Sequence, residues 1–254
     1  MSGKWKIVWL CSLFLLIAGN LHADELFSAK LGYQLLAPEG SIAGSLEGNA
    51  QEFDVEDDLN LDDSEDLTGE IALQWGNSRL SLNYLPISFS GTGTLTVSGT
   101  FGGEDYTAGE TVSSDLDIDL YDISYTYYLL NFDDLPTRFQ LGLELAVKVA
   151  DIDVTLKNLS EDFVESESVI APIPTIGART RIALADFLAI VGRIGYLEFD
   201  DNHFLDAEAQ LEYSPVPNIG IYAGTRIFDL KVDEDDVYVE TQFSGPFGGL
   251  LVRF

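Results

Sequence analysis

Apolar and polar residues alternate along most of the chain from residue 27 onward. In residues 137–149 the odd positions from Phe139 onward are apolar, and the positions between them include Glu144 and Lys148. A period of two is that of a β-strand whose two faces meet different surroundings. The pattern predicts ten such strands, at residues 27–35, 69–75, 79–84, 122–129, 137–149, 176–184, 188–196, 205–213, 219–227 and 237–254.

The links between these strands alternate in kind, as they do at the two rims of an antiparallel up-and-down barrel. Short links are predicted at 76–78, 131–136, 185–186 and 214–218, on the periplasmic rim. The outer loops are predicted at 48–66, 101–113, 157–170, 200–203 and 233–236. A chain that starts and ends on one rim needs an even number of strands, which ten satisfies. Eight strands is the alternative, because the 200–203 loop is short and Pro38 and Gly40 follow the first strand.

Two prolines fall inside predicted strands, whereas proline normally occurs at strand ends and bulges. At both Pro86 and Pro246 the apolar residues also change from one parity to the other. A β-bulge, which inserts one extra residue into a strand, accounts for both observations. We therefore predict a bulge at each proline.

The basic residues are concentrated on the polar faces of the predicted strands. A soluble β-sandwich also alternates, but it does not require this sorting. A narrow lumen inside lipid-facing strands does, because buried charges must be paired. We therefore predict an all-β transmembrane barrel and keep the secreted sandwich as an alternative. The predicted lumen network is Lys30, Glu70, Arg79, Arg138, Glu144, Lys148, Arg179, Arg181, Arg193, Glu208 and Arg226.

Aromatic residues lie on the apolar parity near the ends of several strands, as in the girdles of membrane barrels. They are Trp75, Tyr84, Tyr125, Tyr127, Tyr213 and Phe254. The last strand, from Phe247 to Phe254, ends in an aromatic residue after alternating apolar positions. It resembles the C-terminal recognition signal of bacterial outer-membrane barrels. The resemblance implies a location in the outer membrane and contact with the barrel-assembly machinery through Phe254.

The N-terminus has the layout of a secretory signal peptide. Lys4 and Lys6 precede an apolar stretch at residues 7–18, which is shorter than the roughly 20 residues of a spanning helix. We predict a signal peptide at 1–23, cleaved after Ala23, and a barrel domain at 24–254. Export through the inner membrane follows from this, and the only cysteine, Cys11, is lost with the leader.

The formal net charge of -30 comes from 43 acidic and 13 basic residues, which argues against binding to nucleic acid. Apolar residues make up 46% of the chain, too many for a disordered protein, so the charge must be segregated into loops and lumen.

The first outer loop is the most acidic segment of the chain. Asp54, Glu56, Asp58 and Glu65 match positions 1, 3, 5 and 12 of a calcium-binding loop, although Leu59 stands where glycine is expected. A Ca²⁺ or Mg²⁺ site is one interpretation. The other is a solvated acidic loop that meets lipopolysaccharide phosphates through divalent cations. Outer-membrane lipid and lipopolysaccharide are therefore the expected partners.

Catalytic chemistry has little support in the sequence. His203 is the only histidine after the predicted leader, and acidic residues flank it. An outer-membrane enzyme, a protease or a lipid-modifying enzyme using this histidine, is kept as an alternative. The leading hypothesis is a non-enzymatic barrel without a resident cofactor. It is either a narrow, porin-like channel for small solutes or ions, or a closed barrel that presents acidic extracellular loops.

Overall fold

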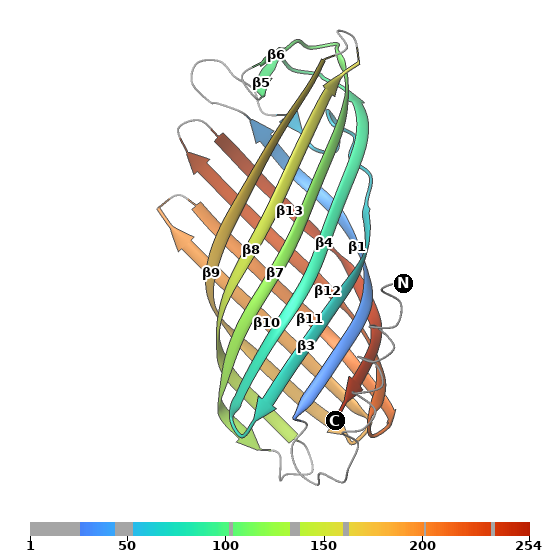
Figure 1. Ribbon diagram of the computed structural model, residues 1–254, viewed down its shortest axis with the longest axis vertical. Helices are drawn as coiled ribbons and strands as arrows, with labels where there is room; N and C mark the ends of the chain where they lie inside the picture. Colours follow the sequence, from blue (N-terminus) through green and yellow to red (C-terminus); the bar gives the residue numbers. More distant parts are fainter. Residues whose placement is uncertain are drawn as a thin grey trace, which may run out of the picture.

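The protein is a closed antiparallel β-barrel of ten long strands (Figure 1). The computed structural model describes residues 26–43, 53–101, 104–132, 138–159, 163–200, 202–234 and 237–254. The long strands are β1 (Phe27–Ala43), β3 (Ser64–Trp75), β4 (Ser78–Thr94), β7 (Thr111–Phe132), β8 (Arg138–Asn158), β9 (Phe163–Ala185), β10 (Leu188–Phe199), β11 (Asn202–Val216), β12 (Ile219–Glu234) and β13 (Val237–Arg253).

Each long strand pairs with the long strands before and after it, and β13 pairs with β1 to close the sheet. All ten predicted strands are present, so the ten-stranded fold is confirmed and both the eight-stranded barrel and the sandwich are wrong. No helix among the described residues is long and apolar enough to cross a membrane. The predicted signal peptide at 1–23 lies outside the described residues.

The barrel has two unlike ends, called lower and upper here as they appear in Figure 1. The lower end carries the short turns, such as Gly76–Asn77 between β3 and β4, and the final residue, Phe254. The upper end carries the short strands β2 (Phe53–Asp54), β5 (Gly99–Phe101) and β6 (Glu104–Tyr106). The β5–β6 hairpin forms a small sheet of its own.

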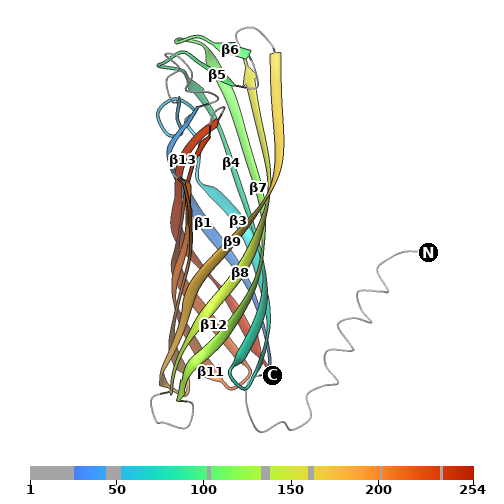
Figure 2. The ribbon, with the colours of Figure 1, turned by 90° about the vertical axis from the view of Figure 1, so that its left-hand side faces the viewer.

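The wall of the barrel is higher along β7, β8 and β9, which have 22, 21 and 23 residues (Figure 2). The β8–β9 ladder continues to the pair Asn158–Phe163, so the predicted loop at 157–170 is wrong and most of it is strand. The β9–β10 ladder ends at Ile176–Tyr196, below the top of β9. We call the upper parts of these three strands, residues 111–120, 150–158 and 163–175, the outer extension.

The predicted bulge at Pro86 is wrong. The β4–β7 ladder runs from Ser78–Tyr127 to Thr94–Thr111 without a shift in register. On the lower part of β4, Leu80, Leu82 and Tyr84 point outward and are exposed, whereas from position 85 upward the apolar residues Leu85, Ile87 and Phe89 point inward and are buried. The strand therefore keeps its register, and it is the apolar side chains that change from the outer to the inner face.

The bulge predicted at Pro246 is also absent, because the β12–β13 ladder passes through this residue in register. Both prolines lie where the ladder on one side is missing. The β3–β4 ladder ends at Gly69–Tyr84, just below Pro86, and β1 pairs with Phe247 and Ser244 but not with Pro246. A proline has no backbone N–H to donate, so it fits at such positions without a lost hydrogen bond.

Candidate functional site

The lower half of the lumen is filled by charged side chains, which we call the ionic layer. Its basic members are Lys30, Arg79, Lys148, Arg179, Arg181, Arg193, Arg226 and Arg253, and its acidic members are Glu70, Asp122, Glu144, Asp206, Glu208 and Glu212. The alternation of each strand directs them inward, since neighbouring residues face the lipid side. Except for Arg181, these side chains are at most about one-tenth exposed.

One part of the ionic layer is centred on Lys148, whose side chain is fully buried. Its Nζ atom donates to Oδ2 of Asp122 at 2.7 Å and to Oδ2 of Asp206 at 2.6 Å. The Arg193 guanidinium donates to Asp122 and to Glu144, so Asp122 joins the two cations. These residues come from β7, β8, β10 and β11, and their charges tie facing walls of the barrel together.

A second part of the ionic layer lies against β1, β3, β4 and β12. Oε1 of Glu70 lies 2.8 Å from Nη2 of Arg79 and 3.6 Å from Nζ of Lys30. Arg226 donates to Glu208 and, at 3.2 Å, to Oε1 of Gln34. Toward the lower rim, Glu212 accepts from Arg253 and lies within 3.6 Å of Lys30 and 3.5 Å of Arg181.

Of the predicted network, all members except Arg138 lie in the ionic layer. Arg138 is at the lower rim, about one-third exposed, and pairs with the turn residue Asp186 at 3.0 Å. The list had left out Asp122, Asp206, Glu212 and Arg253, although each occupies the polar parity of its strand. Strand parity already places these four residues on the polar face, whereas their partners across the lumen depend on the three-dimensional fold.

The space left in the ionic layer is small. A cavity of about 20 Å³ is lined by side chains that include Lys30, Asn83, Glu208, Tyr222 and Arg226. A cavity of this size holds about one water molecule. The described side chains thus leave this cavity too small for a solute larger than about one water molecule.

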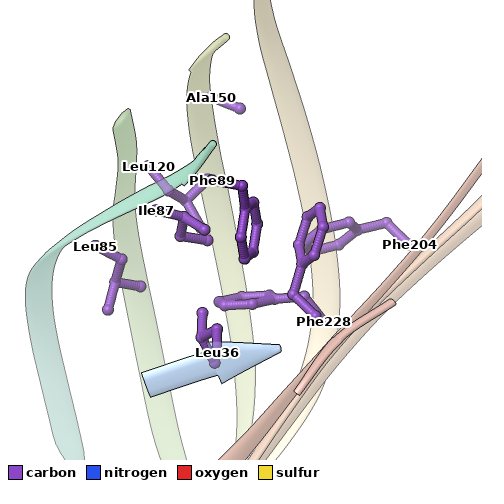
Figure 3. Close-up of a cluster of buried hydrophobic side chains, with 9 residues drawn as sticks. Leu36, Leu85, Ile87, Phe89, Leu120, Ala150, Phe204 and Phe228 are labelled. Atoms are coloured by element: carbon purple, nitrogen blue, oxygen red, sulfur yellow. The ribbon is translucent and has the colours of Figure 1, made fainter. Parts of the chain in front are cut away.

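Above the ionic layer the lumen is apolar. Leu36, Leu85, Ile87, Phe89, Leu120, Ala150, Phe204, Phe228 and Phe243 form a buried cluster, which we call the apolar layer (Figure 3). The rings of Phe89 and Phe243 are 4.9 Å apart and those of Phe204 and Phe228 are 6.3 Å apart. These side chains come from β1, β4, β7, β8, β11, β12 and β13, and they meet inside the lumen above the charges.

The first loop folds back into the upper mouth instead of standing in solvent. Its residues Phe53, Val55 and Leu59 pack with Leu95, Tyr106, Val112 and Leu156 in a third buried cluster. A Cβ atom at Gly91 or Gly93 would collide with the backbone oxygens of Asn60 and Asp58, so glycine is required where the loop crosses β4. The described part of this loop, residues 53–63, which we call the plug, therefore packs against the inner face of the outer extension.

The structure does not gather the predicted calcium ligands. The Asp58 carboxylate accepts hydrogen bonds from Asp54 and Thr96, Asp54 accepts from the backbone of Glu56, and Glu65 accepts from Tyr33. Among the described residues, no group of three or more histidine, cysteine or acidic side chains is placed to hold a metal ion. These carboxylates instead cap backbone and hydroxyl groups of the plug and its surroundings.

Asp58 has a perturbed ionisation. Burial raises the pKa of its carboxyl group, but the hydrogen bonds from Thr96 and Asp54 outweigh burial, so the pKa lies below its ordinary value. The ionised carboxylate therefore stabilises the plug at neutral pH. This contribution is present above the ordinary pKa and is lost as the pH falls through the lowered one.

His203 lies on strand β11 and not in a loop. Its Nε2 atom is 3.2 Å from Oδ1 of Asp229, and it makes no other hydrogen bond with the residues that the structure describes. Asp206 points into the lumen and bonds to Lys148, away from this histidine. The described surroundings of His203 thus supply a carboxylate but no hydroxyl nucleophile within hydrogen-bonding distance.

The outer surface of the lower and middle barrel is apolar, with exposed residues such as Leu82, Ile123 and Leu145 on adjacent strands. All six aromatic residues predicted for the girdles are exposed on this surface. At its upper border the hydroxyls of Tyr33, Tyr84 and Tyr196 donate to Glu65, Asp119 and Glu198. Apolar surface ends there and acidic surface begins.

The outer extension has the opposite polarity. Asp115, Asp117 and Asp153 are exposed on its outer face, whereas Leu116 and Ile118 pack against the apolar layer. On β7 and β8 the extension is thus built like a water-soluble sheet, with apolar side chains inside and charges outside, whereas on β9 the apolar residues Val164, Val169 and Ile170 are exposed as well. Its only described basic residue is Lys157.

Several solved structures match this chain. Outer membrane protease OmpT from Escherichia coli matches with a TM-score of 0.64 and 12% identity, over 93% of this chain and 99% of that chain. Neisserial surface protein A is 14% identical over 92% and 100% of the two chains, with a TM-score of 0.38. Ail from Yersinia pestis is 10% identical over 90% and 99%, with a TM-score of 0.36.

No protein-family model matches the chain. A search of curated proteins likewise finds no match. The match to the protease shows that this chain has the fold of a bacterial outer-membrane β-barrel. Barrels of this kind include proteases, adhesins and channels, so the function of this chain has to be argued from its own lumen and surface.

Proposed function

We propose that the protein is a closed, non-enzymatic barrel of the outer membrane that holds an acidic surface above the bilayer for interaction. The observation that carries this proposal is the filled lumen. The ionic layer, the apolar layer and the plug lie one above another inside the barrel wall. A channel needs a continuous wet path, and these three layers interrupt it.

The interaction surface is the outer extension. Its strands continue the ladders of the barrel, so the carboxylates of Asp115, Asp117 and Asp153 stand on a rigid sheet instead of a loop. A dense row of carboxylates attracts cationic partners and divalent cations. Lipopolysaccharide phosphates bridged by divalent cations suit this surface. Contact of the strand ending in Phe254 with the assembly machinery is proposed on the terminal resemblance alone.

Conductance in a planar lipid bilayer tests whether the barrel is closed. Because the lumen is filled at three levels, we expect no unitary current steps from the folded protein. A gel comparison of unheated and boiled samples from the same preparation serves as the control that the protein is folded. Steady current steps whose size changes in the Arg193→Gln variant would contradict the closed barrel and favour the narrow channel.

An outward substitution on β7 tests the proposed membrane span. Ile123 is 52% exposed and lies between two outward tyrosines, Tyr121 and Tyr125. Ile123→Arg is expected to reduce the free energy of unfolding in lipid vesicles by an amount between the roughly 0–1 kcal/mol of arginine near an interface and the roughly 2–4 kcal/mol of arginine at the bilayer centre. The matched control is Asp117→Arg, on the same strand and face but in the outer extension, which is expected to change little. Equal effects of the two variants would place both positions in the same medium and reject the assigned boundary.

A further inference from the structure

The small cavity in the ionic layer lies between side chains of strands that are not neighbours in the sheet. Glu70 and Asn83 line it from β3 and β4, and Glu208 and Arg226 line it from β11 and β12. Its volume of about 20 Å³ has room for one water molecule. A cavity lined by polar groups is the kind that holds buried water, whereas empty cavities in proteins are apolar.

The guanidinium of Arg226 has one nitrogen atom that no described residue satisfies. Its Nη2 atom donates to Glu208, and its Nη1 atom donates to Oε1 of Gln34 at 3.2 Å. The ring centroids of Phe247 and Phe228 lie 5.0 and 5.6 Å from its Cζ atom. The Nε atom is buried and has no hydrogen-bond partner among the described residues. Because the other two nitrogen atoms are engaged, turning the group to satisfy Nε would break the bonds that they make.

The charges around the cavity favour a neutral ligand. Lys30 and Arg226 bring two positive charges to its lining, and Glu70 and Glu208 bring two negative charges. An ion of either sign would upset this balance. A water molecule keeps it, and its oxygen accepts from an N–H donor while its two hydrogens are given to acceptors. A buried N–H group left without an acceptor is costly, so the Nε atom of Arg226 gains from such a partner.

We propose that one ordered water molecule binds in this cavity, where it accepts a hydrogen bond from Nε of Arg226 and donates to the polar side chains Glu70 and Asn83. It links β12 to β3 and β4, with which β12 shares no backbone ladder. The water is thus a structural part of the ionic layer and satisfies a donor that the chain itself leaves unpaired. The site does not depend on the interaction proposed for the outer extension.

A high-resolution crystal structure of the wild-type protein tests the site directly, in crystals grown with rubidium bromide because both of these ions scatter anomalously. One electron-density peak is expected in the cavity, within hydrogen-bonding distance of Nε of Arg226 and without an anomalous signal. A cavity without density would overturn the proposal. An anomalous peak there would overturn it as well, because the ligand would then be an ion and not water.

Two substitutions at the cavity test the role of the water. Asn83→Leu keeps the branched shape of the side chain but replaces its amide by methyl groups, so the water should be lost and Nε of Arg226 left without an acceptor. The density peak should disappear, and the folded-to-unfolded ratio in equilibrium unfolding in detergent micelles should fall about tenfold.

Gly69→Ala is the matched control. Gly69 lines the same cavity, but the alternation of β3 directs an added methyl group to the outer face, where the nearest atom beyond its chain neighbours is the backbone oxygen of Lys30 at 3.9 Å. This variant should keep both the peak and the stability of wild type. A peak retained in Asn83→Leu would reject the assigned partner, and unchanged stability after its loss would contradict the structural role of the water.

Discussion

Replacing Asp122 by alanine is expected to lower the free energy of unfolding of the barrel by about 3–5 kcal/mol, as for other buried ion pairs that lose one partner. Asp122 is fully buried and one of its oxygens contacts both Lys148 and Arg193. Its loss leaves two buried cations with fewer counter-charges than before. Urea-induced unfolding in lipid vesicles, followed by tryptophan fluorescence, measures the change.

Two controls separate charge imbalance from lost volume. Asp122→Leu combined with Lys148→Met removes one charge of each sign and keeps the space filled, so its stability is expected to be close to that of wild type. Asp186→Ala removes the carboxylate of the exposed rim pair and should produce no measurable change. If the double variant were as unstable as Asp122→Ala, the cost would come from packing or hydrogen bonding and not from unpaired charge.

The second large effect is expected in the apolar layer. Phe89 is 2% exposed and its ring packs on Phe243 at 4.9 Å, inside the lumen. Phe89→Ala leaves a cavity there and should cost about 3–5 kcal/mol of unfolding free energy. Phe199, which is 70% exposed, provides the matched control, and Phe199→Ala is expected to stay within about 0.5 kcal/mol of wild type. Similar small changes in both variants would show that Phe89 does not sit in a packed interior.

The lipid-facing part of the barrel could be predicted from the sequence because its two faces differ sharply. In residues 139–149 every outward position is apolar and the inward ones include charges, and the observed β8 follows this pattern. The same rule identified inward charges such as Lys148 and Arg193. It needs only the sequence of one strand, so it needs no knowledge of the fold.

The strands of the outer extension were not predicted, because their two faces do not differ in polarity in this way. In residues 157–170 the outward positions are Val164, Ser166, Ser168 and Ile170, and the inward ones include Glu165 and Glu167, so neither face is uniformly apolar. Without a difference in polarity between its two faces, the sequence of this segment does not indicate a strand, and a loop was predicted. The apparent bulge at Pro86 has the same origin, because the pattern was assumed to keep its apolar residues on one face along the whole strand.

The pairing of charges could not be predicted. Lys148 bonds to Asp122, which is 26 residues away, and Arg226 bonds to Gln34, which is 192 residues away. Such contacts depend on the tilt and stagger of the closed sheet, which no single strand contains.

The upper part of β9 extends beyond its neighbour β10, and the sequence protects the unpaired edge that results. Beyond Ile176 the described part of β9 has no strand on its β10 side, and a bare edge of this kind invites edge-to-edge pairing with other chains and aggregation. Pro172 and Pro174 stand at the start of that edge and offer no N–H, and Glu165 and Glu167 add negative charge further along it. The missing N–H donors and the negative charge thus both oppose pairing of this edge with a strand of another chain.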